Sequence, residues 1–337
     1  MHAWNPPNRF HTTEVEWEEP PPPPKLEIIE DRSRGIISEN NSPDVGFDSS
    51  VNPYRGCTHG CAYCYARPTH EYLGWGAGSD FDRKILVKLR APELLREAFD
   101  HRSWEGKEVV FSGVTDCYQP VERKYELTRG CLEVCADYCN PAGIITRSPL
   151  ITRDLEVLQR LAAFGGIKVT FSIPIADPEL QRKIEPGAPP PEARFRAMRT
   201  LSDAGIPVGV SVSPVIPGIN ESLVPESLQR ARDAGARWAW SIDLRLPGAV
   251  AQVFEHRIRE ALPLRAGRVM NGVRRMRSGE LNDSRFGSRM RGSGSAALAS
   301  RQLFELWREK LGFEAMPPAP WPSPFRRPGA GCQLKLL

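Results

Sequence analysis

The sequence of 337 residues contains no apolar run that approaches the roughly 20 residues needed to cross a membrane. Its start, MHAWNPPNRFHTTEVEWEEP, lacks both the basic start and the apolar stretch of a secretory signal. Eight cysteines are too few for a disulfide scaffold in a chain of this length. These absences predict a cytoplasmic protein without a membrane partner, whose clustered thiols are metal ligands or reactive groups.

Proline is concentrated in one short segment near the amino terminus. The stretch EEPPPPPK at 18–25 must be extended, because each proline ring restricts φ and removes a backbone donor. We interpret it as a spacer. Changes in composition and periodicity along the sequence predict three parts. These are an N-terminal extension at 1–45, a core at 46–250 and a basic, mainly helical C-terminal extension at 251–337.

Short β-branched runs alternate with segments of helical period throughout the predicted core. The expected strands are SSVNPY at 49–54, KEVVFSG at 107–113, GIITRS at 143–148, IKVTFSIP at 167–174, IPVGVSVSPVIP at 206–217 and WAWSIDLRL at 238–246. Expected helices lie between them at 92–102, 125–138, 153–164, 191–204 and 223–234. This alternation requires parallel strands and right-handed crossovers, in a doubly wound sheet or a (β/α) barrel. Six such units predict an α/β fold, a partial (β/α)6 TIM-type barrel, with its chemistry in the loops after the carboxyl ends of the strands.

Three cysteines cluster in NPYRGCTHGCAYCY, directly after the first expected strand. Cys57, Cys61 and Cys64 have the spacing C-x3-C-x2-C, and the next cysteine along the chain is Cys117. A structural zinc ion would need a fourth protein ligand, for which His70 is the main candidate. A 4Fe-4S cluster fits better, because three thiolates hold three irons and leave the fourth iron open. Both alternatives make the three thiols metal ligands.

The segment CTHGCAYC, with the aromatic Tyr63 before the last cysteine, resembles the signature of the radical S-adenosylmethionine (radical SAM) superfamily. The stretches SGVTDCYQPVERKYELTR, ITRSPLITRDLEVL and RFGSRMRGSG further resemble a bacterial subfamily related to spore photoproduct lyase, a DNA-repair enzyme. The resemblance implies a 4Fe-4S cluster whose open iron binds S-adenosylmethionine, and a low-potential electron donor of flavodoxin or ferredoxin type. It also implies lyase-like or other radical chemistry, started by a 5′-deoxyadenosyl radical from reductive cleavage of S-adenosylmethionine.

The resemblance implies cofactor-binding residues after the second and third expected strands. Many members carry Gly-Gly-Glu at the first of these places, where it holds the amino group of the cofactor. Here the place reads SGVTDCY, which makes Ser112, Thr115 and Asp116 the candidates. Arg147 is placed to pair with the cofactor carboxylate, since the arginine fork matches a carboxylate. The alternative for Arg147 is a solvated charge at a strand end.

Further cofactor-binding candidates lie near the cysteines and after the fourth expected strand. Tyr63 belongs to the cysteine motif itself. Ser172 either bonds the ribose or carboxylate of the cofactor, or has its hydroxyl satisfied by the backbone. Glu185 and Arg194 resemble family positions after that strand, and the alternative is a salt bridge between a loop and a helix.

The remaining cysteines divide into two groups. Cys117 follows the second expected strand on the catalytic side, so its thiol, or the phenol of Tyr118, is the candidate for returning a hydrogen atom to a product radical. The alternative is a packed residue under the loop. Cys131, Cys135 and Cys139 lie on successive turns of one expected helix, whose rise of about 1.5 Å per residue separates the outer pair too widely for a compact cluster. We expect these three to be buried apolar residues.

A basic region follows the end of the alternation near residue 250. Residues 257–310 hold thirteen arginines and lysines against five acidic residues. The excess of arginine favours phosphate recognition and a nucleic acid substrate, with a solvated helical cap as the alternative. A protein or small metabolite is the alternative substrate, and a zinc- or cluster-stabilised nucleic-acid-binding module without catalysis is the alternative function. The arginines expected to follow a phosphate path are Arg274, Arg275, Arg277, Arg289 and Arg291.

Overall fold

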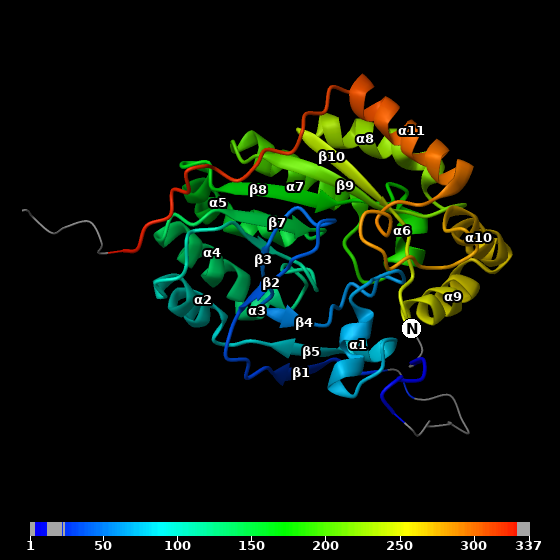
Figure 1. Cartoon of the computed structure of the whole chain (residues 1–337), viewed down its shortest axis with the longest axis horizontal. Helices are drawn as coiled ribbons and strands as arrows, with labels where there is room; N and C mark the ends of the chain where they lie inside the picture. Colours follow the sequence, from blue (N-terminus) through cyan, green and yellow to red (C-terminus); the bar gives the residue numbers. More distant parts are fainter. Residues whose placement is uncertain (1–3, 12–21, 23, 329–337) are drawn as a thin grey trace, which may run out of the picture.

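A seven-stranded sheet forms the core of the computed structural model, which describes residues 4–11, 22 and 24–328 (Figure 1). Most of the stretch EEPPPPPK, together with Cys332, lies outside the described residues. The strands follow the order β10-β9-β8-β7-β6-β3-β2. They span Ile37–Glu39 (β2), Ser49–Val51 (β3), Val109–Phe111 (β6), Ala142–Thr146 (β7), Ile167–Ser172 (β8), Val208–Val215 (β9) and Trp238–Asp243 (β10).

Six of these strands are parallel, and they are the six expected from the sequence. The additional strand β2 pairs antiparallel with β3, with Ile37 opposite Val51. Strands β2 and β10 form the two edges of the sheet, so the sheet is open and does not close into a full barrel. This confirms the prediction of a partial barrel.

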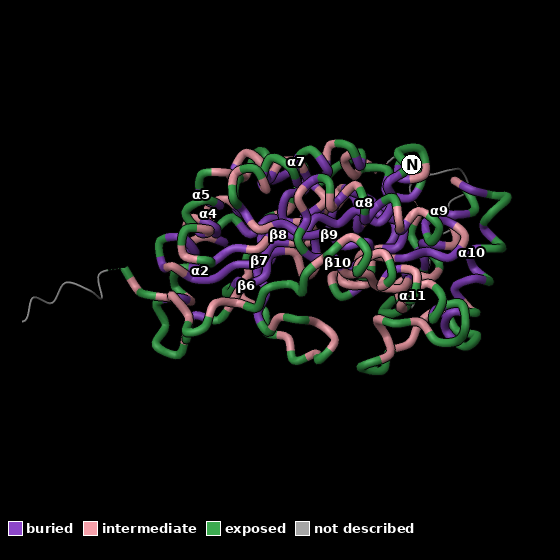
Figure 2. The backbone as a smooth tube through the Cα atoms, turned by 90° about the horizontal axis from the view of Figure 1, so that it is seen from above, coloured by how far each residue is buried: buried purple, intermediate pink, exposed green. Residues whose placement is uncertain are grey.

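Helices follow the parallel strands and cover one face of the sheet, as the alternation predicted. Figure 2 shows the strands as a largely buried band with α4, α5 and α7 along one side. Gly205 and Gly235 adopt φ values of +83° and +94° directly after α7 and α8, where glycine ends a helix most easily. The helices of this region are Ala91–Asp100 (α2), Glu122–Tyr125 (α3), Leu127–Asp137 (α4), Pro149–Asp154 (η3), Leu155–Ala162 (α5), Pro178–Ile184 (α6), Pro191–Asp203 (α7), Glu221–Leu223 (η4) and Val224–Asp233 (α8).

The two faces of the sheet differ in chemistry, because side chains alternate along each strand. Phe111, Phe171 and Val210 point to the helical side and belong to the main hydrophobic core. The other face carries polar side chains near the carboxyl ends of the strands, among them Ser172 and Ser211. This second face is therefore the one that can hold a polar cofactor or substrate.

A second, three-stranded sheet of order β1-β5-β4 lies beside the main sheet and was missed in the sequence. Its strands are Glu27–Glu30 (β1), Tyr54–Arg55 (β4) and Lys84–Val87 (β5). The short elements Arg67–Thr69 (η1), Glu71–Leu73 (η2) and Ser79–Arg83 (α1) connect β4 to β5. The amino-terminal residues pack on this connection, where the amide of Trp4 donates to the hydroxyl of Ser79 at 3.2 Å. Part of the expected N-terminal extension therefore contacts the core.

Three helices follow the sheet, in the region expected to be helical and basic. They are Val250–Ala261 (α9), Pro263–Met276 (α10) and Gly294–Lys310 (α11). The chain then runs back across the molecule to α2 (red in Figure 1), where the ring of Phe325 lies 5.9 Å from that of Phe99. None of the described helices is both long and apolar enough to cross a membrane. The division into three parts at residues 45 and 250 stays a prediction.

Candidate active site

The three clustered cysteines lie in the loop that connects β4 to η1, here called the cysteine loop (residues 56–66). Cys57 and Cys61 are buried, Cys64 is half-buried, and all three are free thiols. Burial raises the pKa of Cys57 and that of Cys61, the latter to about 12, and the neighbouring thiols add to both shifts. The three sulfurs are therefore near neighbours in a site largely closed to water.

Hydrogen bonds from distant segments hold the cysteine loop in place. The amide of Cys57 donates to the carbonyl of Phe81 at 3.0 Å. Gln119 forms a clamp, since its Nε2 donates to the carbonyl of Gly56 at 2.9 Å while its Oε1 accepts from the amide of Thr58 at 3.1 Å. Sequence reasoning missed Gln119, whose only signal is its place after the second parallel strand of the core. These bonds satisfy backbone groups that would otherwise be buried without partners.

Two close approaches of the backbone require glycine at this loop. Gly56 has φ of +79°, and a Cβ atom there would lie 2.7 Å from the carbonyl oxygen of Lys84. A Cβ atom at Gly187 would lie 2.2 Å from the carbonyl oxygen of Thr58, beside the bond that the Gly187 amide donates to His59 O at 2.9 Å. A larger residue at either position would displace the loop.

Two arginines bind carbonyl groups of the cysteine loop and share one carboxylate. Arg67 is fully buried, and its Nη2 donates to the carbonyl of Cys61 at 2.7 Å and to Asp82 at 2.8 Å. Arg257, from α9, donates to the carbonyl of Gly60 at 2.7 Å and also pairs with Asp82. The C-terminal helices therefore contribute directly to the shape of the loop. No sequence pattern pointed to either arginine.

Arg147 follows β7 and reaches the cysteine loop from the main sheet. Its Nη1 lies 2.6 Å from Sγ of Cys61, 2.9 Å from Oε1 of Glu185 and 3.2 Å from the hydroxyl oxygen of Tyr63. Its Nη2 donates to the hydroxyl of Ser172 at 3.3 Å. The side chain is only 17 % exposed, so Arg147 is not a solvated charge at a strand end.

Glu185 is fully buried between two arginines. Nη2 of Arg194 donates to its carboxylate at 2.6 Å, and Nη1 of Arg194 donates to the carbonyl of Ser172 at 3.0 Å. The hydroxyl of Tyr63 also bonds this carboxylate. Burial alone would raise the pKa of Glu185, but Arg194 and Arg147 together hold it at about 2. The structure thus joins five residues that the sequence had proposed separately.

The segment after β6 turns around Asp116. The carboxylate of Asp116 accepts from the hydroxyl of Thr146 at 2.7 Å and from the amide of Arg147 at 2.8 Å. Nδ1 of His59 lies 3.5 Å from it, but burial lowers the pKa of His59 to about 4, so this ring is neutral at pH 7. Within the described part of the chain, the nearest permanent cation is Nε of Arg147 at 4.0 Å. The charge of Asp116 is therefore balanced mainly by neutral donors.

Ser112 and Thr115 bond backbone groups of their surroundings. The hydroxyl of Ser112 accepts from the amide of Cys117 at 3.0 Å, and that of Thr115 donates to a carbonyl of β4 at 3.1 Å. Ser112 adopts φ of +88°, a backbone conformation unusual for serine. Sequence reasoning missed Asn52, whose Oδ1 accepts a hydrogen bond from the amide of Gly113 at 3.0 Å. These contacts shape the turn that presents Asp116.

The geometry does not favour the zinc alternative. Nε2 of His70 lies 2.9 Å from the carbonyl oxygen of Lys84 and is engaged there. Within residues 4–11, 22 and 24–328, no three histidine, cysteine, aspartate or glutamate side chains converge closely enough to hold one metal ion. Thiolates that bind separate irons of a cube stand farther apart than the ligands of a single ion. The donor set therefore fits a cluster better than zinc.

The family model described as "Radical SAM superfamily" matches residues 51–231, which is more than half of the chain. The chain belongs to the radical SAM superfamily. Radical SAM enzymes bind a 4Fe-4S cluster and S-adenosylmethionine, and they need a reductant. The predicted membership of this superfamily, with these two cofactors, is confirmed.

Comparison with curated proteins gives relatives in several organisms. An uncharacterised protein of Mycobacterium tuberculosis is 36% identical over 211 residues, which are 62% of each chain. An uncharacterised protein of Methanocaldococcus jannaschii is 31% identical over 195 residues, 58% of this chain and 70% of the relative. A radical SAM Nα-GlyT isomerase of Pseudomonas phage M6 is 27% identical over 171 residues, 50% of this chain and 33% of the relative. The chain thus spans about 62% of the length of the mycobacterial relatives it matches.

Among solved structures, spore photoproduct lyase has a similar fold. One variant of that enzyme gives a TM-score of 0.62 at 16% identity and covers 85% of this chain and 80% of its own. Another, with bound AdoMet and dinucleoside spore photoproduct, gives 0.61 at 16% identity and covers 86% of this chain and 80% of its own. This likeness is one of fold, and it supports the partial barrel.

Cys117 and Tyr118 lie in the main hydrophobic core of this radical SAM protein. They are 1% and 0% exposed, and the hydroxyl of Tyr118 donates to the carboxylate of Asp154 at 3.0 Å. Burial raises the pKa of both groups well above its ordinary value. Return of a hydrogen atom by either residue stays a prediction.

The second cysteine set divides between a helix and the turn after it. Cys131 and Cys135 lie on α4 and are fully buried in the main core, as expected for small apolar residues. Cys139 follows the end of α4, has φ of +48° and is half-buried. The expectation of burial on one helix is therefore confirmed for Cys131 and Cys135.

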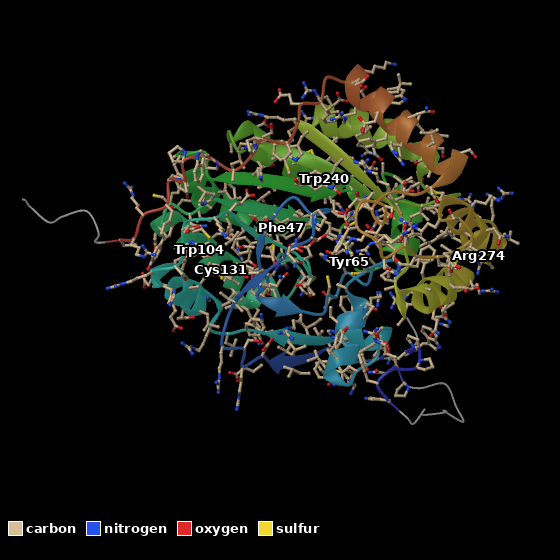
Figure 3. The ribbon with its side chains drawn as sticks, viewed as in Figure 1. Phe47, Tyr65, Trp104, Cys131, Trp240 and Arg274 are labelled. Atoms are coloured by element: carbon tan, nitrogen blue, oxygen red, sulfur yellow. The ribbon has the colours of Figure 1, made fainter. Side chains whose placement is uncertain are left out.

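Tyr65 is a residue of the cysteine loop that sequence reasoning missed. It directly follows Cys64, its side chain is 53% exposed, and its hydroxyl donates to the carbonyl of Gly113 at 2.7 Å. The guanidinium of Arg245, just after β10, lies 5.7 Å from the centre of its ring. Figure 3 labels Tyr65 near the middle of the molecule. Its adjacency to the last cysteine was the available signal.

The arginines proposed as a phosphate path occupy different environments. Arg277 is buried, and its Nε donates to the carbonyl of Leu244 at 2.6 Å. Arg289 pairs with Asp44 at 2.6 Å. Arg275 and Arg291 are exposed, and Figure 3 shows the half-buried Arg274 at the outer edge of the molecule on α10. Two of the five are thus engaged in internal contacts.

Proposed function

We propose that Cys57, Cys61 and Cys64 each bind one iron of the 4Fe-4S cluster and leave the fourth iron to S-adenosylmethionine. The single observation that carries this proposal is the contact of Arg147 with Sγ of Cys61 at 2.6 Å, inside a buried network of opposite charges. When bound, the cluster and S-adenosylmethionine supply an electron and a 5′-deoxyadenosyl radical that abstracts a hydrogen atom from the substrate.

Two residues of opposite charge suit the two ends of the methionine part of the cofactor. Arg147 is our candidate for its carboxylate, since a guanidinium binds carboxylates in a bidentate manner. The long 3.3 Å bond from Arg147 to Ser172 is one that a stronger acceptor would replace. Asp116 is our candidate for its ammonium group, because the surrounding donors are mainly neutral. Ser112 and Thr115 then act by shaping the turn around Asp116.

Glu185 has the role of orienting Arg147. Because Glu185 stays ionised and accepts from Arg147, Arg194 and Tyr63, it holds the guanidinium of Arg147 against the cysteine loop. Ser172 supports the same arrangement through its hydroxyl and its carbonyl. We therefore assign Tyr63, Glu185 and Arg194 to positioning.

Hydrogen return by Cys117 or Tyr118 would require movement of residues 112–118. Both side chains are almost completely covered by the core. A hydrogen atom can pass only between groups in contact, so the thiol or phenol must first reach the polar face of the sheet. We retain both residues as candidates on this condition.

We infer a nucleic acid as the substrate, in the manner of spore photoproduct lyase. Support comes from the shared fold and from arginines that remain exposed in the C-terminal region, such as Arg275 and Arg291. Exposed arginines suit phosphate groups because of their planar, permanently charged fork. A protein or small metabolite is the alternative substrate.

We infer a low-potential electron donor of flavodoxin or ferredoxin type, in a reducing cytoplasm. The inner face of α10 packs in the same hydrophobic cluster as Cys61 and Tyr63. Its outer face carries the exposed residues Arg265, Arg268 and Arg275, and α10 contains no acidic residue. This basic face lies on the helix that packs against the proposed 4Fe-4S site. It suits an acidic electron carrier, because opposite charges steer association.

Anaerobic turnover tests the proposed function. Reconstituted protein, reduced with dithionite, should convert S-adenosylmethionine into 5′-deoxyadenosine and methionine. Replacing Arg147 by lysine retains the charge but loses the fork, so we expect about tenfold or more weaker binding of S-adenosylmethionine at an unchanged iron content. The matched control is Arg153→Lys, which changes an arginine of the core ion pairs with Glu122 and Asp154. Protein with four irons per chain that forms neither product would refute the proposal.

A further inference from the structure

A cavity of about 350 Å³ opens at the second sheet, where β1 and β5 end and α2 begins. None of its described lining residues belongs to the candidate cofactor site. Its cationic lining residues are Arg32, Arg34, Lys88 and Arg90. Three acidic residues, Glu30, Asp31 and Glu97, also line it, so the four cations exceed the carboxylates by one and repel each other unless a further anion binds.

Lys88 is the central observation at this cavity. Its side chain is 6% exposed, yet its ammonium group has no hydrogen bond or salt bridge with any residue of the described chain. Burial lowers the pKa of Lys88, and the nearby Arg55 lowers it further. A buried charge without a partner is costly, so proteins seldom retain one without a ligand or another function.

The acidic residues of the lining balance this charge only in part, since Asp31 attracts Lys88 through space but forms no hydrogen bond or salt bridge with it. Asp31 is engaged by the amide of Ser33 at 2.9 Å and lies 3.3 Å from Nε of Arg55, which is a separate cation. Glu97 pairs with Arg90 at 2.8 Å. The remaining acid, Glu30, is exposed. The lining therefore holds four cations against three carboxylates, and two of these carboxylates, Asp31 and Glu97, already pair with arginines, so the cavity has an excess of positive charge.

The backbone holds these cations in place. Lys88 N donates to Pro53 O at 3.0 Å, and Asp31 N donates to Val87 O at 2.9 Å, so both chain segments are tied to the ends of their strands. The bond from Ser33 to Asp31 closes the turn that carries Arg32 and Arg34 at the rim. Helix α2 starts immediately after Arg90, and the positive end of its dipole adds to the potential.

We propose that this cavity binds a phosphate group, with Lys88 as its buried charge and Arg32 and Arg34 as its rim. Phosphate takes both a point charge from lysine and the fork of arginine, and its several oxygens can satisfy donors from different directions. The phosphate belongs either to a small phosphorylated compound or to the backbone of a nucleic acid. The site does not depend on the proposed cofactor chemistry, because it shares no residue with it.

Titration of the reconstituted protein of 337 residues with inorganic phosphate at constant ionic strength tests this site. Calorimetry should show one binding event, and Lys88→Met should weaken it by at least about tenfold, since a charged hydrogen bond is lost. The matched control Lys107→Met changes an exposed lysine and should leave binding unchanged. The double variant Arg32→Gln, Arg34→Gln alters exposed side chains only, so it tests the rim even if the Lys88 variant does not fold.

Labelling of amines with acetic anhydride gives a second measurement on the unaltered protein. Phosphate should protect Lys88 from acetylation, as read by mass spectrometry, while Lys107 reacts equally with and without it. Competition by a short oligonucleotide that also protects Lys88 would assign the phosphate to a nucleic acid. Competition only by glycerol phosphate would assign it to a small compound. Equal labelling of Lys88 with and without phosphate, or binding that both variants retain, would overturn the proposal.

Discussion

Removal of the buried charge of Glu185 should destabilise the protein by a predictable amount. Its pKa falls from an ordinary 4.5 to about 2 in the folded protein, because the pull of Arg194 and Arg147 exceeds the effect of burial. At about 1.4 kcal/mol for each pKa unit, the ionised form adds about 3 kcal/mol to the free energy of unfolding at pH 7. Glu185→Gln preserves the shape but leaves both arginines without a charged partner, for which a loss of about 3 to 5 kcal/mol is typical.

The pH dependence of stability has a definite sign. The folded pKa of Glu185 is lower than the unfolded one, so its contribution is complete above pH 4.5 and is lost as the pH falls toward 2. Integration between the two pKa values predicts a loss of about 1 kcal/mol by pH 4 and about 2 kcal/mol by pH 3. The difference between wild type and Glu185→Gln should narrow over the same range.

Urea unfolding of the anaerobic protein at pH 7, pH 5 and pH 4, followed by circular dichroism, measures these differences. The matched control is Glu179→Gln, an exposed glutamate at the start of α6, which should change the free energy of unfolding by less than about 0.5 kcal/mol. If Glu185→Gln lowers the free energy of unfolding by less than about 1 kcal/mol, or by the same amount at every pH, Glu185 is not the ionised partner of Arg147 that we describe.

Three further predictions concern the cluster, its reduction and the substrate. Cys61→Ala should abolish the cluster, measured as iron content, whereas the buried Cys135→Ala should retain all of it; equal iron in both would contradict the assignment of ligands. Arg268→Glu on α10 should slow reduction of the cluster by flavodoxin about three- to tenfold at low salt, without affecting its reduction by dithionite. The control Arg259→Glu should have a smaller effect, because Arg259 already pairs with Glu255 on α9. Arg291→Gln should flatten the slope of log affinity for an oligonucleotide against log salt by about 0.7 to 0.9, measured by fluorescence anisotropy. An unchanged slope would show that Arg291 does not contact phosphate, and no binding by the wild type would contradict a nucleic acid substrate.

Much of the fold was predictable because its signals are local. Six parallel strands and the helices between them follow from β-branched runs and apolar periods that each extend over a few residues. The second sheet was missed for the same reason, since β1 has a mostly exposed pattern and β4 is only two residues long. Such short strands are defined by their partners rather than by their own sequence.

The candidate site was predictable in part. Its residue types and their places after strands indicated Arg147, Ser172 and Glu185, but not that one carboxylate would serve two arginines. Arg277 was expected to face phosphate, and instead its side chain donates to the carbonyl groups of Asp243 and Leu244 at the end of β10. The sequence does not distinguish a charged residue that faces solvent from one that is buried and bonded to the backbone.

The sequence by itself determined the spacing of the three cysteines and the alternation of strands and helices, because both depend on residues close together along the chain. Only the tertiary structure decided which charges meet. Arg147 and Glu185 are 38 positions apart, and their contact at 2.9 Å exists because consecutive parallel strands end at the same edge of the sheet. The side chain of Lys88 has no bonded partner among the described residues for a related reason, since the ends of β1 and β5 leave a cavity beside it. Burial and pairing of charges depend on how the crossovers place distant segments, and no local pattern records that placement.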